Sequence, residues 1–240
     1  MPAPDLSQIL GLSFDCYGTL IDWESGLLGV LIPWAQRNGL TTDAETLLGV
    51  FSAAESDAET VSPGSPYRSI LRDVMRRIAE RLGAAATEDD GRRLAESVGE
   101  WPAFEDTAAA LDRLQRRCAL VIVSNIDRVS FAGTQTTLGV AFDAVVTADE
   151  VGAYKPDARM FEAAEDAFAA LGVARGEHLH VAQSLYHDIT PAAARGWRTC
   201  WVDRRSGRPG GATPAVSREV KPDLMVRTLA ELADLFEGAS

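Results

Sequence analysis

Short apolar runs rich in β-branched residues recur along the chain, and in its second half they alternate with segments of helical periodicity. The runs have the pattern of buried parallel strands and cover residues 12–15, 119–125, 143–147, 178–184 and 198–203. The helical segments between the later runs cover residues 104–117, 156–171 and 188–196. Because strand–helix–strand units form right-handed crossovers, this alternation predicts an α/β fold with a doubly wound, Rossmann-like parallel sheet.

The interval between the first and second predicted strands has a different pattern. Residues 24–100 contain no convincing strand and consist of helix-period segments, with breaks at the sequence VSPGSP and at Gly83. We therefore predict a core domain of residues 1–22 and 101–240, with a small all-helical cap domain, residues 23–100, inserted after the first strand. Ligands in open α/β sheets bind outside the carboxyl ends of the strands, which is where such an insert would lie.

The composition excludes several kinds of partner. A formal net charge of −12 argues against nucleic acid or an anionic membrane surface, since both require a basic patch. The three cysteines have no metal-binding spacing, which favours a reduced protein of the cytoplasm. The N-terminal sequence has neither a basic region nor a long apolar run, so we expect no signal peptide and no membrane span.

Polar residues stand at the ends or exits of four predicted strands. They are Asp15, the pair Ser124 and Asn125, Lys155, and Asp188. A single acid at a strand end could simply cap a turn. The carboxyl ends of parallel strands meet at one edge of a sheet, however, so four such signals together predict an active site there.

The motifs that contain these residues resemble those of the haloacid dehalogenase superfamily. They are FDCYGTL, VIVSN, YKPD and HVAQSLYHD, in the order that the superfamily has them, and the resemblance covers essentially the whole chain. The helical insert after the first motif resembles the superfamily's cap domain. Together the motifs are specific for the superfamily and much less specific for a substrate.

The resemblance implies a covalent mechanism. Asp15 would be the nucleophile that attacks the substrate and forms an ester or acyl phosphate. The backbone N–H groups of Cys16 and Tyr17 would face the developing negative charge. Lys155 would keep Asp15 ionised and help to hold an anionic substrate, and Asp188 would orient or deprotonate the water that hydrolyses the intermediate.

Further polar residues of the motifs complete the predicted site. The hydroxyl groups of Thr19 and Ser124 would hydrogen-bond the nucleophile or the substrate and are counted with the catalytic residues. Besides Cys16 and Tyr17, the predicted substrate-binding residues are Asn125, Gln183, Ser184 and His187. For His187, a role in the pocket and a purely local hydrogen bond are equally good interpretations. His178 and His180, which alternate on one strand, are interpreted as ordinary sheet residues without a zinc site.

Two positions distinguish attack at a carbon atom of the substrate from hydrolysis of a phosphate ester. Phosphatases of the superfamily carry a second aspartate two residues after the nucleophile, as a general acid, and acids of the fourth motif help them to bind Mg²⁺. Here these positions hold Tyr17 and Gln183. Tyrosine is a poor proton donor near neutral pH unless its pKa is strongly lowered, and glutamine supplies no charge to a metal. We therefore expect neither a metal nor another cofactor.

The superfamily branch with tyrosine at this position is the 2-haloacid dehalogenases. The resemblance thus implies a metal-independent hydrolase that acts through Asp15 on an activated carbon next to a carboxylate, with a small organic acid as substrate. One alternative is a Mg²⁺-dependent small-molecule phosphatase of the same superfamily. Others are metal-free hydrolysis of a non-halogenated substrate such as a strained cyclic amino acid, and a binding module that has lost turnover. Capped members of the superfamily are often dimers, so a homodimer is a further expectation.

Departures from the dehalogenase pattern concern the substrate. Dehalogenases place an arginine early in the second cap helix, whereas residues 47–59 contain no basic residue and Val50 stands near that place. Arg68, Arg204 and Arg205 could supply the cation, although a surface position is favoured for each of them.

Phe161 stands where the branch often has a tyrosine. Glu55 and Asp57 are predicted to lie on a solvated face of the cap. If Glu55 instead faced the site, it would favour a substrate that carries an amine.

Overall fold

Six parallel strands form one sheet in the part of the chain that the computed structural model describes, residues 4–62, 65–208, 212–213 and 221–239. In spatial order they are β3 (Ala144–Thr147), β2 (Ala119–Ser124), β1 (Gly11–Phe14), β4 (His178–Ala182), β5 (Arg198–Val202) and β6 (Leu224–Val226). Strand order reverses beside β1, as in a doubly wound sheet, so the predicted fold class is confirmed. The short strand β6 was not predicted, because three residues carry too little periodicity.

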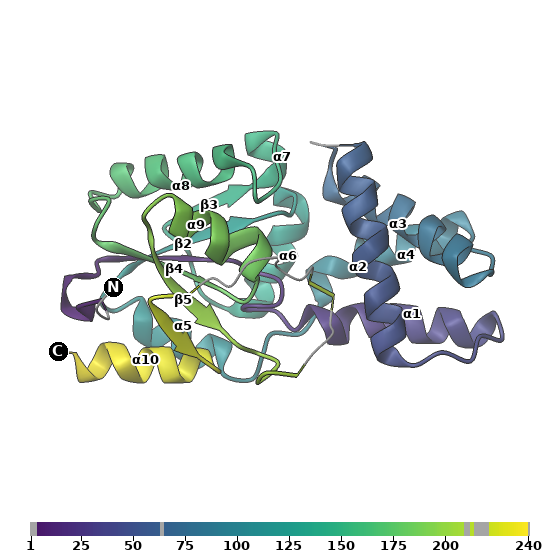
Figure 1. Ribbon diagram of the computed structural model, residues 1–240, viewed down its shortest axis with the longest axis horizontal. Coiled ribbons are helices and arrows are strands. Elements are labelled where there is room, and N and C mark those ends of the chain that lie inside the picture. The colour runs from purple at the N-terminus through teal and green to yellow at the C-terminus, as the bar shows by residue number, and fades with distance from the viewer. Residues whose placement is uncertain (1–3, 63–64, 209–211, 214–220, 240) are drawn as a thin grey trace.

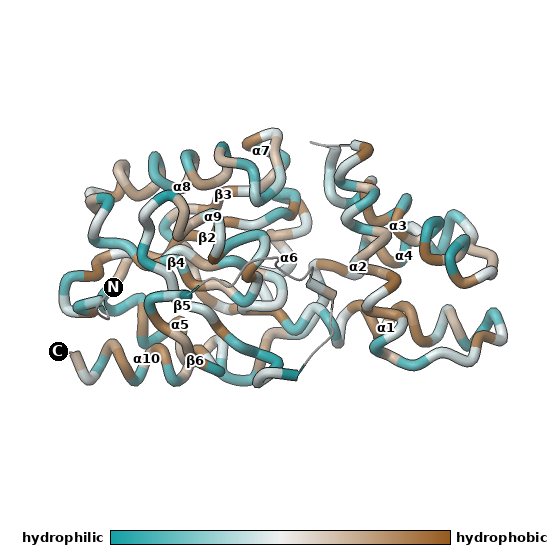
Figure 2. The backbone as a smooth tube through the Cα atoms, viewed as in Figure 1, coloured by the Kyte–Doolittle hydropathy of each residue, from teal (hydrophilic) through white to brown (hydrophobic). Residues whose placement is uncertain are grey.

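Helices cover both faces of the sheet, as Figure 1 shows. One face packs against α5 (Thr107–Leu114), α6 (Arg128–Leu138) and α10 (Leu229–Gly238). The other packs against α8 (Ala158–Ala170) and α9 (Thr190–Ala194), and α7 (Ala148–Val151) follows β3 directly. The central strands are buried on both sides, and they form the hydrophobic centre of the tube in Figure 2.

Four helices between β1 and β2 form a separate bundle beside the sheet (Figure 1). They are α1 (Trp23–Arg37), α2 (Ala44–Val61), α3 (Tyr67–Leu82) and α4 (Glu88–Ser97). The side chains of Asp22, Asp43 and Thr87 accept hydrogen bonds from the first turns of α1, α2 and α4, which explains why these helices begin there. We call this bundle the cap; that it is a domain of its own stays a prediction.

The segment that enters the cap and the segment that returns from it lie side by side. Asp22 donates its backbone N–H to the carbonyl of Pro102 at 2.8 Å, and Ile21 forms an isolated bridge with Ala103. The Trp101 ring packs so closely on Gly26 that a Cβ atom there would lie 2.2 Å from the ring. This contact requires glycine at position 26 of α1. It holds the start of the cap against the segment that returns to the core.

None of the helices in the described ranges is both long and apolar enough to cross a membrane.

Candidate active site

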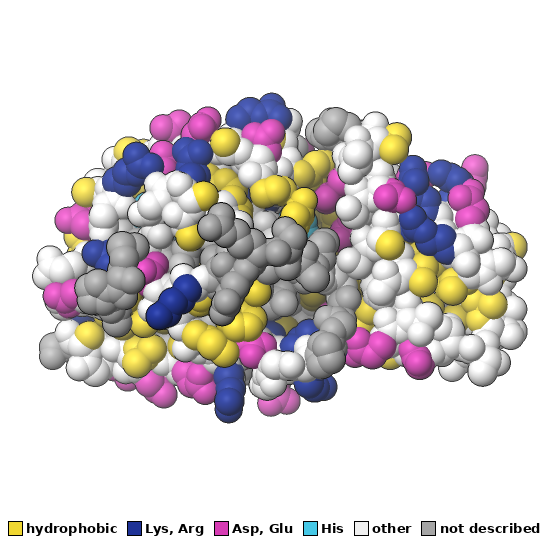
Figure 3. Space-filling model, viewed as in Figure 1, with side chains coloured by type: hydrophobic (Ala, Val, Ile, Leu, Met, Phe, Trp, Pro, Cys, Tyr) yellow, Lys and Arg dark blue, Asp and Glu magenta, His cyan; other side chains and the backbone are white. Residues whose placement is uncertain are grey.

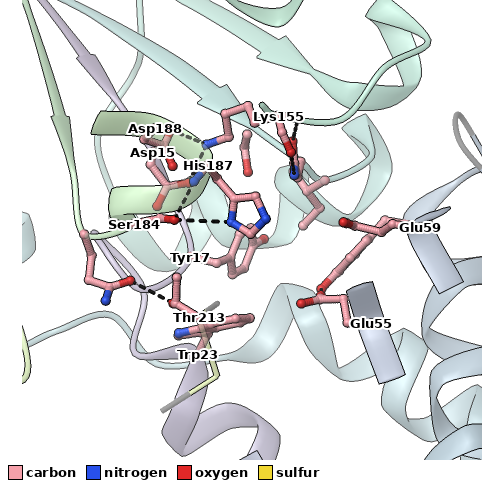
Figure 4. Close-up of a pocket in the computed structure, with 15 residues that line it drawn as sticks. Asp15, Tyr17, Trp23, Glu55, Glu59, Lys155, Ser184, His187, Asp188 and Thr213 are labelled. Atoms are coloured by element: carbon pink, nitrogen blue, oxygen red, sulfur yellow. Dashed lines mark hydrogen bonds and ion pairs between the residues drawn. The ribbon is translucent and has the colours of Figure 1, made fainter. Parts of the chain in front are cut away.

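The carboxyl ends of β1, β2 and β4 meet under the cap and form a pocket (Figure 4). Asp15 directly follows β1, Ser124 ends β2, and Asp188 lies in the helical turn Leu185–Ile189 after β4. Lys155 comes from the loop before α8. The pocket has about 530 Å³ of space between atoms, part of which is open to solvent.

Lys155 joins the two acids of the pocket. Its Nζ atom lies 2.8 Å from Asp15 Oδ1, 2.7 Å from Asp188 Oδ1 and 2.9 Å from the carbonyl oxygen of Val123, so each of its three N–H groups has an acceptor. Burial raises the pKa of Asp15, and the Lys155 ammonium opposes that rise. Burial works to lower the pKa of Lys155, but the two carboxylates raise it above its ordinary value. The three groups form one buried charge cluster.

Thr19 and Asn125 support this cluster from either side. The Thr19 hydroxyl donates to Asp15 Oδ2 at 2.7 Å and accepts the backbone N–H of Gln183 at 2.9 Å, which joins the first motif to the fourth. Both polar atoms of the Asn125 side chain bond the backbone of Lys155. Asn125 therefore holds the lysine loop in place, and its predicted contact with a substrate stays a prediction.

Asp188 has a second partner that was not predicted. His180 Nε2 lies 3.0 Å from Asp188 Oδ1, and its Nδ1 lies 2.9 Å from the Ser13 hydroxyl. If Ser13 donates to Nδ1, the ring donates from Nε2 to the carboxylate. His180 lies in β4, as expected of a sheet residue, but its contact with Asp188 was not predicted. Strand register aligns Ser13 with His180, and that register cannot be read from the sequence.

The two oxygens of Asp188 differ. Burial works to raise its pKa, but Lys155 and His180 lower it to about 2, so this carboxyl group is ionised at neutral pH. Oδ1 accepts hydrogen bonds from both neighbours, whereas the buried Oδ2 has no partner among the described residues. An ionised oxygen without a partner, in a residue that lines the pocket, is suited to hold a water molecule.

The turn after Asp15 leaves backbone donors free. The carbonyl of Cys16 accepts the N–H groups of Thr19, Leu20 and Ile21, while the N–H groups of Cys16 and Tyr17 have no acceptor in the described residues. Gly18 has a φ of +89°, a conformation that side chains other than glycine rarely adopt. This tight turn therefore presents two N–H groups beside the Asp15 carboxylate.

Tyr17 and Gln183 have partners that give them no acid role. The Tyr17 hydroxyl lies 2.6 Å from Thr134 Oγ1, and burial raises its pKa well above the ordinary value. Gln183 Oε1 accepts the Thr213 hydroxyl at 3.0 Å. Neither side chain is therefore placed as a proton donor at neutral pH.

Ser184 and His187 form a local pair on the pocket wall. Ser184 Oγ accepts the backbone N–H of His187 at 2.9 Å and lies 3.2 Å from its Nδ1 atom. Burial lowers the pKa of His187 to about 4, so the ring is neutral near pH 7. Both interpretations of His187 thus hold in part, because it bonds locally and also lines the pocket.

The cap wall of the pocket is acidic. Glu55 and Glu59 point from α2 toward the core residues in Figure 4, and Tyr67 of α3 donates its hydroxyl to Glu55 Oε1 at 2.5 Å. The prediction that Glu55 lies on a solvated face was wrong, since only 8% of it is exposed. Asp57 is exposed as predicted and pairs with Arg81.

Helical spacing in α2 explains the correction and shows what signal could have found these residues. The buried apolar residues of α2 are Leu47, Leu48, Phe51, Ala54 and Ala58. Glu55 lies four residues after Phe51, within this stripe, and Glu59 lies one turn further along. Burial raises the pKa of Glu55 to about 7; burial and the charge of Glu55 raise that of Glu59 to about 9.

The three candidate arginines lie outside the pocket. Arg68 donates to Ser130, Arg204 pairs with Asp106, and Arg205 pairs with Glu24 and Glu45. Within the described ranges, the basic or imidazole side chains of the pocket are Lys155 and His187. Figure 3 shows acidic side chains where the sheet and the cap meet. No described residue therefore replaces the missing cap arginine.

The comparisons with known proteins show the family of the chain. A sequence profile of the haloacid dehalogenase-like hydrolases matches residues 9–196. The chain belongs to this family. It is 29% identical over 245 residues to (S)-2-haloacid dehalogenase H-109 of Pseudomonas putida, covering 95% of this chain and 98% of that enzyme.

Two further similar proteins are a phosphatase and a dehalogenase of known structure. Phosphoserine phosphatase of Thermus thermophilus is 32% identical over 209 residues, which cover 83% of this chain and 76% of the phosphatase. The structure of L-2-haloacid dehalogenase from Xanthobacter autotrophicus with chloropropionic acid covalently bound matches with a TM-score of 0.78 at 20% identity. That match covers 97% of this chain and 100% of the other, and it shows a shared fold.

The expectation that this haloacid dehalogenase-like hydrolase works without Mg²⁺ stays a prediction, which two features of the site favour. Asp15 and Asp188 share the Lys155 ammonium, and an amide, Gln183, stands at the position of a phosphatase acid. Mg²⁺ requires octahedral oxygen ligands and usually includes one or two carboxylates. Among the residues with a described placement, no group of three or more His, Cys, Asp and Glu side chains is arranged to hold a metal ion.

Proposed function

We propose that this hydrolase attacks an activated carbon next to a carboxylate with Asp15, without a metal ion. The observation that carries the proposal is the position of Lys155 Nζ between Asp15 and Asp188. An ammonium fixed between the two acids counters the repulsion between them and leaves Asp15 ionised as a nucleophile. The similarity to enzymes named (S)-2-haloacid dehalogenase supports this reaction.

In the first step, an oxygen of Asp15 forms a bond to the carbon and the bond from that carbon to the leaving group breaks. A halide departs with the electron pair as a stable anion, so no general acid is needed. The N–H groups of Cys16 and Tyr17, which have no acceptor among the described residues, lie in the turn next to Asp15, where they can bind negative charge of the substrate. The high pKa of Tyr17 agrees with a reaction that takes no proton from it.

In the second step, water attacks the carbonyl carbon of the Asp15 ester. The unpartnered Oδ2 of Asp188 orients the water, and the ester bond breaks between that carbonyl carbon and the substrate oxygen. Asp15 keeps the oxygen of the water, and the product leaves as an alcohol with an oxygen from Asp15. The sum is R–X plus water giving R–OH, a proton and X⁻.

A second candidate function is phosphoester hydrolysis. The similarity to a protein named phosphoserine phosphatase favours it, at 32% identity. Tyr17 and Gln183, at the positions of two phosphatase acids, argue against it. A third candidate keeps the Asp15 chemistry but acts on a non-halogenated substrate such as a strained cyclic amino acid; the absence of an arginine among the described pocket residues favours it.

The test is halide release from chloroacetate and from both enantiomers of 2-chloropropionate, with EDTA present. We expect release by the wild type and none by Asp15→Asn, whereas Asp166→Asn, an exposed acid on α8, serves as the matched control and keeps full activity. In a single turnover in H₂¹⁸O, mass spectrometry should find the label in the peptide that contains Asp15.

Two results would contradict the proposal. One is Mg²⁺-dependent turnover of phosphate esters that EDTA abolishes, which would favour the phosphatase. The other is halide release that persists in Asp15→Asn. Failure to release halide from all three acids would redirect the search to non-halogenated substrates, with the ¹⁸O label as the test of the nucleophile.

A further inference from the structure

The cap wall of the pocket carries two carboxyl groups for which the described residues supply no basic partner. Glu55 is 92% buried; its Oε1 accepts the Tyr67 hydroxyl, and its Oε2 has no hydrogen bond among these residues. Glu59 is half-buried and has neither a hydrogen bond nor an ion pair with any of them. Buried acids are normally paired, because removal of a carboxylate from water is costly without a partner.

The helix gives the pair a fixed geometry. Glu55 and Glu59 are four residues apart on α2, so their side chains lie on the same face of the helix. Two like charges at this spacing repel each other, which destabilises the helix when both are ionised. A cation bound between them would remove this repulsion.

The core residues on the other side of the pocket cannot supply that cation. Lys155 already uses its three N–H groups on Asp15, Asp188 and Val123. His187 is neutral at pH 7. With all four carboxyl groups ionised, the pocket therefore has an excess of negative charge, and a purely anionic substrate would increase it.

From this arrangement we infer that Glu55 and Glu59 bind a protonated amine of the substrate. The substrate is then a small acid with an ammonium group rather than a simple haloacid. This inference rests on the proposed function, because it assigns the substrate class of the same site. The reaction itself stays as described above, with the amine bound on the side away from Asp15.

The core wall offers a matching place for the substrate carboxylate. Ser124 is 1% exposed, lines the pocket and has no hydrogen bond to its hydroxyl among the described residues. The N–H groups of Cys16 and Tyr17 also lack acceptors there. These donors can bind a carboxylate near Asp15 while the glutamates bind the ammonium, so a zwitterion would span the pocket.

The titration of the pair couples the binding of an ammonium group to the release of protons. Burial raises the pKa of Glu55 to about 7 and that of Glu59 to about 9, so without a ligand the pair holds protons at neutral pH. A bound ammonium favours the ionised form, and its binding should therefore release protons. A neutral pair could instead donate hydrogen bonds to a substrate carboxylate, which is the competing interpretation that the experiment must exclude.

The experiment compares two substrates that differ only in charge. They are 4-amino-2-chlorobutanoate and 2-chloropentanoate, in which a methyl group replaces the ammonium. We expect the wild type to prefer the amino acid roughly 10- to 100-fold in kcat/KM, the effect of a hydrogen bond to a charged group. The Glu55→Gln/Glu59→Gln variant should lose this preference, because glutamine keeps the shape and the acceptor for Tyr67 but removes the charge.

Asp57→Asn is the matched control. It removes one charge from the same helix on its exposed face and should keep the wild-type preference. Thermal unfolding checks that each variant is folded, and the single variants Glu55→Gln and Glu59→Gln replace the double variant if that one does not fold. A preference that survives the glutamine substitutions, or one for 2-chloropentanoate, would overturn the inference.

A binding measurement separates this inference from the proposed function. Calorimetry on Asp15→Asn would compare 4-amino-2-hydroxybutanoate with 2-hydroxypentanoate, which are the corresponding alcohols. If no chlorinated acid is turned over but the amino alcohol acid still binds more tightly and requires both glutamates, the inference stands and the proposed reaction fails. If turnover requires Asp15 but neither assay shows a preference for the ammonium, the inference fails and the reaction stands.

Discussion

The pocket has a core wall, at the carboxyl ends of the strands, and a cap wall, formed by residues of α2 and α3. The charged groups of these two walls are paired to different extents. On the core wall, Asp15, Lys155 and Asp188 bond to one another, and Thr19 and His180 add further hydrogen bonds. On the cap wall, two glutamates face the cavity, and one tyrosine hydroxyl is their hydrogen-bond partner among the described residues. On the core wall both carboxylates are paired with the Lys155 ammonium before any ligand arrives, whereas the described residues supply no ion-pair partner for the two glutamates of the cap wall.

This difference corresponds to two tasks. A nucleophile and the group that orients its water must be held within a fraction of an ångström, which requires partners on the protein itself. A group that recognises a substrate must keep its bonding capacity for that substrate. The comparison therefore suggests that the core wall performs the reaction and that the cap wall selects the substrate.

The largest expected effect tests the ion pairs of the core wall. Lys155→Met would leave two buried carboxylates without their cation. We expect activity to fall by roughly 10³-fold and stability by about 3–5 kcal/mol, as for the loss of one partner of a buried ion pair. Halide release and urea unfolding would measure the two effects. Lys221→Met removes the only other lysine, which is exposed, and should change neither; an active Lys155→Met enzyme would contradict the assignment.

A smaller effect tests the hydrogen bond behind Asp188. His180→Phe keeps a ring but removes the donor to Asp188 Oδ1, and we expect ester hydrolysis to slow roughly 10- to 100-fold. Mass spectrometry should then show accumulation of the Asp15 ester, with KM unchanged. His178→Phe is the control on the same strand, because the His178 ring nitrogens have no hydrogen bond in the described residues. Equal rates in the two variants would disprove the positioning role.

The pH dependence of stability tests the cap wall. Glu55 and Glu59 have raised pKa values in the folded state, about 7 and about 9, against 4.5 as the ordinary value. The folded state therefore binds more protons than the unfolded state, and this contribution to stability is present below pH 4.5 and is lost as pH rises toward 9. Tyr67, Tyr154 and Lys155 are the other titratable groups that interact with the pair.

The measurement is the free energy of unfolding at pH 5 and pH 9. We expect the decrease between them to be smaller in Glu55→Gln/Glu59→Gln than in the wild type, by at least about 2 kcal/mol. Asp57→Asn should behave as the wild type does. A decrease that is the same in all three proteins would show that the cap carboxyl groups titrate normally, and the contrast between the walls would not hold.

The smallest effect concerns Tyr17. Tyr17→Phe removes the hydrogen bond to Thr134, so we expect a loss of about 1 kcal/mol in stability and a change in kcat of no more than about threefold. Steady-state kinetics and thermal unfolding measure both. A general acid at this position would instead lose roughly 10²-fold or more in rate, which would move the protein toward the phosphatase interpretation.

Much of the core wall could be predicted because it consists of local signals. Asp15, Ser124 and Asp188 each follow or end an apolar run, and parallel strands bring such positions to one edge of the sheet. The partners of these residues were harder to predict. His180 meets Ser13 only through strand register, and Asn125 holds the backbone of Lys155 across 30 residues of chain.

The cap wall shows the limit more clearly. The acidic composition of α2 suggested a solvated face, but Glu55 lies within the apolar stripe of that helix and turns toward the pocket. The helix phase was present in the sequence. The sequence did not show what the apolar stripe packs against, since a helix can bury one face against its own bundle, against the sheet or over a cavity.

The chain by itself determined the alternation of strands and helices, the place of the cap and the order of the motif residues, because these depend on periodicity and on neighbours in sequence. The tertiary structure alone decided which oxygens of Asp188 are bonded, where the arginines point and that Glu55 and Glu59 face Lys155 across a cavity. These contacts join residues that are between 8 and about 100 positions apart in the chain, and their geometry exists only once the elements that carry them have packed.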